Sequence, residues 1–292
     1  MTYKRLDILK GISLMLFCQF FSASSLNLVK ISSHYIHPIV MTWLIFSICF
    51  VFLLIHQCLL KNTFSITTNH FYTHFIRSTL GGVYFAMLFY AAHLIPTAES
   101  ITLRGTAPIW LCLISLIILK KSISLRVLLA VFLGFLGITL VLHPNFEKTN
   151  IGYFLALGSG LCFSINALLT HKLSNHQEPY ERILFYTFLI PTMILSPYAL
   201  THLPAELMHS TLALHILFAA LCIFLVYIFY IHSLALAPPI IILPLSNIGV
   251  LFAGLYDWLI WGHIPHPSTL LGMIIVIISC IYIALKPSPN SY

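Results

Sequence analysis

The stretch FSASSLNLVK, residues 21–30, follows a basic and then an apolar N-terminal run, which is also the order of a secretory signal peptide. A related stretch, FSINALLTHK, occupies residues 163–172, which lie 142 positions further along the chain. Phe, Ser, Leu and Lys stand at the same four places in both. A cleaved leader has no reason to recur in the middle of a protein. Residues 21–30 are therefore predicted to end the first membrane span of a chain with two similar halves.

Composition places the chain in the membrane. Hydrophobic residues make up 60% of it and charged residues only 7%, whereas a soluble domain has about 25% charged residues. The net charge of +7 is explained by basic loops of a membrane protein, so no nucleic-acid partner is needed. The seven cysteines fall in or beside apolar runs without a CxxC pair. We interpret them as packing residues and expect no cofactor and no metal site.

The apolar runs predict an all-α polytopic membrane protein with ten spans, because each run approaches the roughly 20 residues that cross a bilayer. The expected spans are 7–28, 38–60, 74–95, 97–119, 124–143, 150–171, 181–200, 212–236, 238–261 and 267–286. The 142-residue offset divides them into two repeats of five, residues 1–147 and 148–292. Five is odd, so the second repeat is predicted to be inverted relative to the first, as in many secondary transporters.

Basic residues predict the orientation. With the N-terminus inside, eleven of them fall on the cytoplasmic side and two, Lys30 and Lys148, on the other. This asymmetry favours a multi-pass protein of the bacterial inner (plasma) membrane with both termini cytoplasmic. The eleven are Lys4, Arg5, Lys10, Lys61, Arg77, Lys120, Lys121, Arg126, Lys172, Arg182 and Lys286. Arg77 is interpreted as one of these topology anchors rather than as a ligand.

Two pairs of segments carry a resemblance to a known family. They are TAPIWLCLISLIILKK (106–121) with LGFLGITLVLHP (133–144), and LFAGLYDWLIWGHIP (251–265) with LLGMIIVIISCIYIALKP (270–287). With ten spans in two repeats, the chain resembles the EamA-type members of the drug/metabolite transporter superfamily. The resemblance implies a transporter whose fourth and ninth spans line a central cavity. Lys121 and His263 stand where family members often carry glutamate.

Ionisable residues inside the spans are the main site candidates, since each costs a few kcal/mol to insert. Arg104 in span four and Asp257 in span nine fall at similar predicted depth. The main hypothesis is that the two side chains form an ion pair when the outer side of the transporter is closed. When the outer side opens, they would bind the two oppositely charged ends of a zwitterion. The alternatives are a snorkelling Arg104 and an interfacial Asp257 beside Trp258 and Trp261.

Other candidates are weaker. Glu99 is interpreted first as a favourable acid at a helix N-terminus, and second as a partner of Arg104. His93 and His232, near opposite ends of spans three and eight, are proton-relay candidates, although such histidines are more often simple hydrogen-bonding residues. Pro108 predicts a kink in span four. The further candidates for the substrate site are Asn247 and the aromatic residues Tyr84, Tyr90, Trp110, Tyr227 and Tyr230.

The function that the sequence favours is secondary transport of a small organic metabolite by alternating access, with an amino acid or another carboxylate-bearing solute preferred. The alternatives are an integral-membrane scaffold and a lipid-modifying enzyme. An enzyme of that kind needs clustered acids, yet the only aspartates, Asp7 and Asp257, belong to opposite predicted faces. The expected partners are a small-molecule substrate and the lipid bilayer. A homodimer stays open, because Gly81-Gly82 and Gly158-Ser159-Gly160 could pack within one chain or between two.

Overall fold

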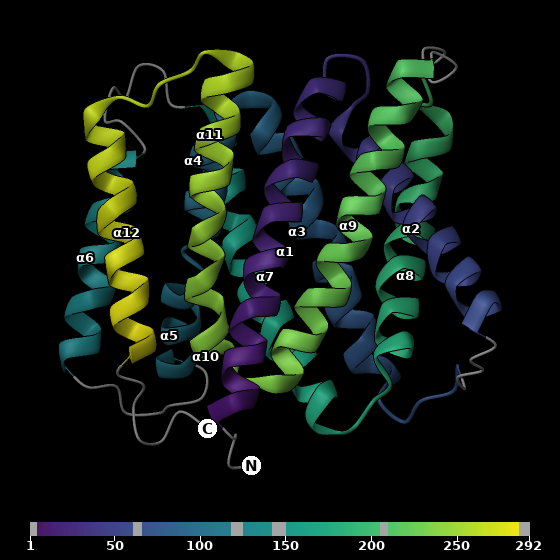
Figure 1. Cartoon of the computed structure of the whole chain (residues 1–292), viewed down its shortest axis with the longest axis horizontal. Coiled ribbons are helices and arrows are strands. Elements are labelled where there is room, and N and C mark those ends of the chain that lie inside the picture. Colours follow the sequence, from purple (N-terminus) through teal and green to yellow (C-terminus); the bar gives the residue numbers. More distant parts are fainter. Residues whose placement is uncertain (1–4, 61–65, 118–124, 142–149, 205–209, 286–292) are drawn as a thin grey trace.

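A computed structural model describes residues 5–60, 66–117, 125–141, 150–204 and 210–285, and these segments form an upright bundle of helices without strands (Figure 1). α1 begins and α12 ends at one end of the bundle, called the terminal end below, and the opposite end is called the far end. The helices are α1 (Arg5–Ser32), α2 (Pro38–Leu60), α3 (Phe71–Leu94), α4 (Thr97–Arg104), α5 (Ala107–Ile117), α6 (Leu125–Val141), α7 (Ile151–Asn175), α8 (Tyr180–Thr201), α9 (Ser210–Leu236), α10 (Pro239–Ile242), the 3₁₀ helix η3 (Leu243–Ile248), α11 (Gly249–Trp261) and α12 (Pro267–Leu285).

The helices confirm the all-α, ten-span prediction. Within the described residues, seven segments are long and apolar enough to cross a membrane, namely most or all of α1, α2, α3, α7, α8 and α9, and η3 together with α11. Shorter apolar stretches in α6 and α12 give two more spans. α4 and α5 follow one another and together form the remaining span, which is span four of the sequence prediction.

The 142-residue interval reappears in the helix boundaries. Three pairs of helices begin 142 residues apart, at Pro38 and Tyr180, at Ala107 and Gly249, and at Leu125 and Pro267. α1 and α3 therefore correspond to α7 and α9. The predicted boundary between the halves, at residues 147 and 148, lies outside the described residues.

Helix packing follows the same symmetry. α1 packs along α9. Their counterparts in the other half, α7 and α3, pack along each other in the same way. α2 packs on its own counterpart α8, and α6 packs on its own counterpart α12. A two-fold axis that relates the two inverted halves generates both kinds of contact. The halves thus interlock rather than standing beside each other as separate five-helix units.

Spans four and nine are both interrupted at equivalent places. α4 ends at Arg104, and α5 begins two residues beyond Gly105, where Pro108 has no N–H for an intrahelical bond. In span nine, Pro244 lies within the 3₁₀ segment that precedes α11. The kink predicted at Pro108 is therefore present as a break between two helices. Backbone of this kind is tolerated at membrane depth where surrounding protein satisfies it.

Candidate functional site

Arg104 lies inside the bundle at the end of α4, with only 3% of its surface exposed. Its guanidinium donates hydrogen bonds to Gln19 Oε1 over 2.9 Å and to Ser22 Oγ over 3.0 Å, both on α1. The same group lies 5.5 Å from the centre of the Phe163 ring on α7. The partners of this buried cation are thus neutral side chains from α1 and α7.

A cluster of four aromatic residues, called the central cluster below, surrounds this position. It consists of Tyr84 on α3, Phe163 on α7, and Tyr227 and Tyr230 on α9. The Phe163 ring lies 5.4 Å from Tyr84 and 5.5 Å from Tyr230, and the two α9 rings are 6.4 Å apart. All four residues are buried. The structure therefore brings together Arg104 and three of the five aromatic residues that the sequence suggested.

The interruptions of spans four and nine meet beside Arg104. Asn247 Nδ2 donates a hydrogen bond to the carbonyl oxygen of Gly105 over 3.2 Å and another to the carbonyl oxygen of Pro244 over 3.3 Å. Asn247 is 2% exposed. Its amide thus supplies a donor to backbone carbonyls near the two breaks in the spans. This places Asn247 next to the candidate site that it was predicted to join.

Asp257 does not pair with Arg104 in this conformation, so the pairing expected for a closed outer side stays a prediction. Its carboxylate accepts hydrogen bonds from the backbone N–H of Ala98 (2.7 Å) and from the hydroxyl of Thr97 (2.6 Å), at the start of α4. Lys30 Nζ lies 3.7 Å from the same carboxylate. Arg104 is at the other end of α4, about 10 Å away at 1.5 Å per residue. Asp257 therefore caps α4 at the far end and joins it to α1 and α11.

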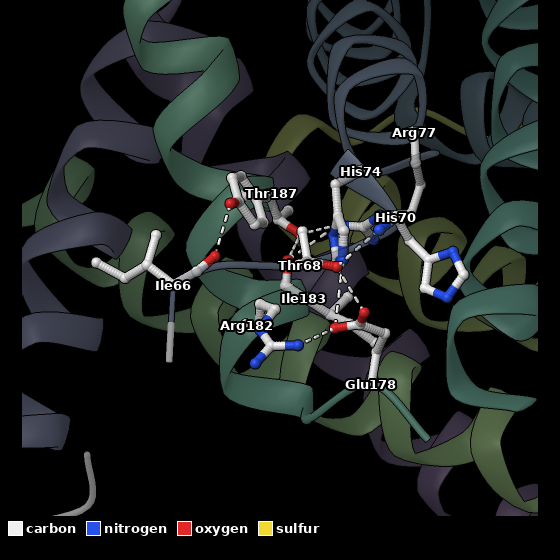
Figure 2. Close-up of polar contacts among 10 residues, drawn as sticks. Ile66, Thr68, His70, His74, Arg77, Glu178, Arg182, Ile183 and Thr187 are labelled. Atoms are coloured by element: carbon white, nitrogen blue, oxygen red, sulfur yellow. Dashed lines mark hydrogen bonds and ion pairs between the residues drawn. The ribbon is translucent and has the colours of Figure 1, made fainter. Parts of the chain in front are cut away.

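Arg77 is the functional candidate that the sequence interpretation missed. It is completely buried, and its guanidinium donates a hydrogen bond to Thr170 Oγ1 (3.2 Å). It also donates hydrogen bonds to the carbonyl oxygen of Ile183 (3.0 Å) and to the hydroxyl of Thr187 (Figure 2). It thus reaches between α7 and α8 rather than into a loop. The available signal was its position, six residues after the start of α3, which is comparable to the depth of Arg104 in span four.

A polar network at the terminal end lies between Arg77, the end of α7 and the start of α8 (Figure 2). Glu178, in the connection between these helices, accepts hydrogen bonds from Thr68 Oγ1 and Arg182 Nη1, each over 2.6 Å. His74 Nε2 lies 3.7 Å from its carboxylate. Burial alone would raise the pKa of Glu178, but the hydrogen bonds from Thr68 and Arg182 outweigh burial and lower it. This network connects the start of α3 to the start of α8.

Comparison with known proteins assigns the family. Residues 9–143 and 150–285 each match the model of the EamA-like transporter family. The chain belongs to this family. It is 24% identical over 209 residues to the pseudopaline exporter CntI of Pseudomonas aeruginosa, covering 70% of this chain and 72% of the exporter. It is also 24% identical over 222 residues to a riboflavin transporter of Vibrio cholerae, covering 75% of this chain and 73% of that protein.

A solved crystal structure shares the fold of this EamA-family transporter. The two superpose with a TM-score of 0.66 over 97% of this chain and 98% of the other, at 16% sequence identity. At that identity the likeness concerns the fold alone. The family and both named relatives are transporters, so the family assignment points to transport rather than to catalysis. No group of three histidine, cysteine or acidic residues that could hold a metal occurs in the described part of the transporter.

The remaining candidates of the EamA transporter lie away from the central cluster. Glu99 is buried in the first turn of α4. His93 Nδ1 lies 3.0 Å from Ser33 Oγ at the far end. The Tyr90 ring lies 5.6 Å from that of His37, also at the far end. These residues belong to the far mouth of the transporter.

The last two candidates, His232 and Trp110, contact residues outside the central cluster. His232 Nδ1 contacts the carbonyl oxygen of Ile228 (2.8 Å), and its ring lies 4.7 Å from Tyr180 near the terminal end. Trp110 on α5 packs edge-on against Phe135 of α6, with ring centres 6.1 Å apart. Trp110 therefore supports the α5–α6 contact in this conformation. Of the two positions that depart from the family pattern, His263 is exposed after α11, and Lys121 lies outside the described residues.

Proposed function

We propose that this EamA-family transporter is a secondary carrier for a small organic solute that bears a carboxylate, amino acids included, and that it works by alternating access. The observation that carries the proposal is the environment of Arg104. This guanidinium is buried at mid-bundle against neutral partners and the Phe163 ring. A solute carboxylate would supply the missing negative charge.

The charge of Arg104 makes a carboxylate the favoured ligand. A buried cation without a counter-charge is costly, and ionisable groups at membrane depth commonly mark substrate pathways. The planar guanidinium can hold a carboxylate through two parallel hydrogen bonds. The bonds to Gln19 and Ser22 hold the guanidinium in place beside the central cluster. Tyrosine rings around it can cover the organic part of the solute.

Polar contacts join helices at both ends of the bundle in this conformation. Asp257 joins α4, α11 and Lys30 at the far end. Glu178 joins the residues before α3 to α8 at the terminal end. Under alternating access, one set of contacts breaks while the other stays closed. We further propose that the terminal end is cytoplasmic and that the membrane is the inner (plasma) membrane, following the distribution of basic residues.

Thermal-shift measurements on the detergent-purified protein test the proposal. Amino acids, organic acids, nucleosides and cationic compounds are compared on wild type, Arg104→Gln and Lys10→Gln. The last variant removes the same charge from an exposed position of α1. Carboxylate-bearing compounds should raise the melting temperature of wild type and Lys10→Gln but not of Arg104→Gln, because a ligand that binds only the folded state stabilises it. Hits that are cationic, or that persist in Arg104→Gln, would contradict the site. A complete absence of hits would favour a scaffold.

A further inference from the structure

The transporter contains a second buried arginine beside the central cluster. Arg77 is anchored on α7 by its hydrogen bond to Thr170, and Arg104 lies over Phe163 of the same helix. Seven residues separate these two contacts, which is about 10 Å along a helix that rises 1.5 Å per residue. Two guanidiniums therefore contact α7 at two levels, Arg77 on the terminal side and Arg104 on the far side.

The central cluster links the two arginines. Arg104 lies over the Phe163 ring, which packs against Tyr84 and Tyr230. Asn166, which lies on α7 between the two levels, donates a hydrogen bond to the carbonyl oxygen of Arg77 (2.8 Å) and accepts one from Tyr230 (3.3 Å). The arginines thus lie on opposite sides of one aromatic cluster rather than in two separate sites.

Neither arginine forms an ion pair among the described residues. The described acidic residues near the bundle interior lie elsewhere: Asp257 contacts α4 and Lys30, Glu178 contacts Thr68 and Arg182, Glu99 lies in the first turn of α4, and Glu181 lies in the first turn of α8. The ionisable side chains near the two arginines are the tyrosines of the central cluster, Cys18 on α1 beside Arg104, and His74, one helical turn before Arg77 on α3. All of these are neutral around pH 7. The centre therefore carries two positive charges without a counter-ion from the described chain.

Several buried polar atoms around the cluster also lack a partner in the described structure. They include Nε of Arg77, Nε of Arg104 and the hydroxyl of Tyr227, in residues that are at most 3% exposed. Buried donors without partners are costly, and in native proteins they commonly belong to functional sites. Three such donors on the two sides of the cluster match a ligand with acceptor groups at two places.

We infer that the transported solute carries two acidic groups, held respectively by Arg104 and Arg77 at opposite sides of the central cluster. The inference rests on the proposed function and specifies its substrate class. A monoanion would neutralise one guanidinium and leave the other uncompensated in a low-dielectric interior. The two levels on α7 require acidic groups separated by several bonds. Two carboxylates on one carbon cannot reach both arginines.

Calorimetric titration with three simple acids tests the inference. The probes are heptanedioate, with a carboxylate at each end, heptanoate, with one, and propanedioate, with two on a single carbon. Wild type should bind heptanedioate about tenfold or more tightly than heptanoate, since a charged hydrogen bond contributes about that factor. Propanedioate should show no such advantage. Arg104→Gln should weaken both seven-carbon acids, and Lys10→Gln should change neither.

Two variants isolate Arg77. Arg77→Gln removes the charge. Thr170→Asp keeps Arg77 and places a carboxylate beside its guanidinium, so it remains informative even where Arg77→Gln fails to fold. Both should reduce the affinity for heptanedioate to that for heptanoate and leave heptanoate binding unchanged. Equal binding of the two acids by wild type, or an advantage that survives both variants, would overturn the inference while leaving Arg104-dependent carboxylate binding intact. Failure of wild type to bind any carboxylate would overturn the proposed function as well.

Discussion

Asn247 and Gly105 are counterparts in the two repeats, and they touch each other. The side-chain amide of Asn247 donates a hydrogen bond to the Gly105 carbonyl over 3.2 Å, across a sequence interval of 142 residues. The same interval separates the starts of three pairs of helices. A contact between counterparts lies at the two-fold axis that relates the halves. Spans four and nine are therefore tied to each other next to their breaks, directly beside Arg104.

A side chain at position 105 should disrupt this tie. A Cβ on Gly105 would collide with Asn247 Oδ1 and approach Asn247 Cγ at 3.0 Å. We expect Gly105→Ala to destabilise the protein by about 1 to 3 kcal/mol, as overpacking of a core does, with a lower melting temperature as the measurement. Asn247→Ala in the same chain should recover part of the loss by removing the colliding atoms. A double variant that is less stable than Gly105→Ala would contradict this explanation.

Loss of the Asp257 charge should loosen the far end. Asp257→Asn keeps the shape but weakens the contacts with Ala98 and Lys30, and we expect a loss of about 1 to 3 kcal/mol. Cys18, buried one residue before Gln19, reports the opening. In a background that keeps only this cysteine, a hydrophilic maleimide should react faster with Asp257→Asn than with the parent. Asp7→Asn, near the start of α1, is the matched control and should leave the rate unchanged.

Stability should depend on Glu178 at low pH. The pKa of this carboxyl is lowered in the folded protein from its ordinary value of 4.5. A depressed pKa contributes stability above the ordinary value, and that contribution is lost as pH falls below 4.5 toward the folded pKa. The melting temperature of wild type minus that of Glu178→Gln should therefore shrink as pH falls from about 7 to about 3. A difference that stays constant across this range would refute the role assigned to the network.

Tyr227 and Tyr230 should respond differently to loss of the hydroxyl. The Tyr227 hydroxyl has no partner among the described residues, so Tyr227→Phe should leave the stability of the unliganded protein within about 0.5 kcal/mol of wild type. Tyr230→Phe removes the hydrogen bond to Asn166 and should cost about 1 kcal/mol. Melting temperatures of the two variants without ligand make the comparison. The reverse order of stability would contradict the hydrogen-bond assignment.

The sequence predicted the fold more completely than the site. Apolar runs, proline positions and the 142-residue interval are local properties of the chain, and they were sufficient for ten spans and for the break at Pro108. The relation between Arg104 and Asp257 was predicted from depth alone. Depth does not reveal that Asp257 faces the first turn of α4, where two N–H groups and a hydroxyl already compete for its carboxylate.

The interpretation of Arg77 shows a second limit of prediction from the sequence. Its proximity to the start of α3 suggested a side chain that reaches the membrane surface, since arginine near a helix end commonly extends to the interface. Thr170 and Thr187 instead provide hydroxyls in the interior, on helices that are about 90 to 110 residues away in sequence. That burial depends on how α3, α7 and α8 are rotated about their own axes. Hydrophobic periodicity specifies such rotation poorly in spans that are apolar all round.

The packing of α2 on α8 and of α6 on α12 has a consequence for motion. Each of these pairs joins a helix to its own counterpart. If each half adopts the conformation of the other during transport, a contact between a helix and its own counterpart is the same before and after the exchange. Such contacts need not change. The contacts of α1 with α9 and of α3 with α7 are instead exchanged for one another. We therefore expect α2, α8, α6 and α12 to form a stationary frame, within which the helices that carry the arginines and tyrosines rock.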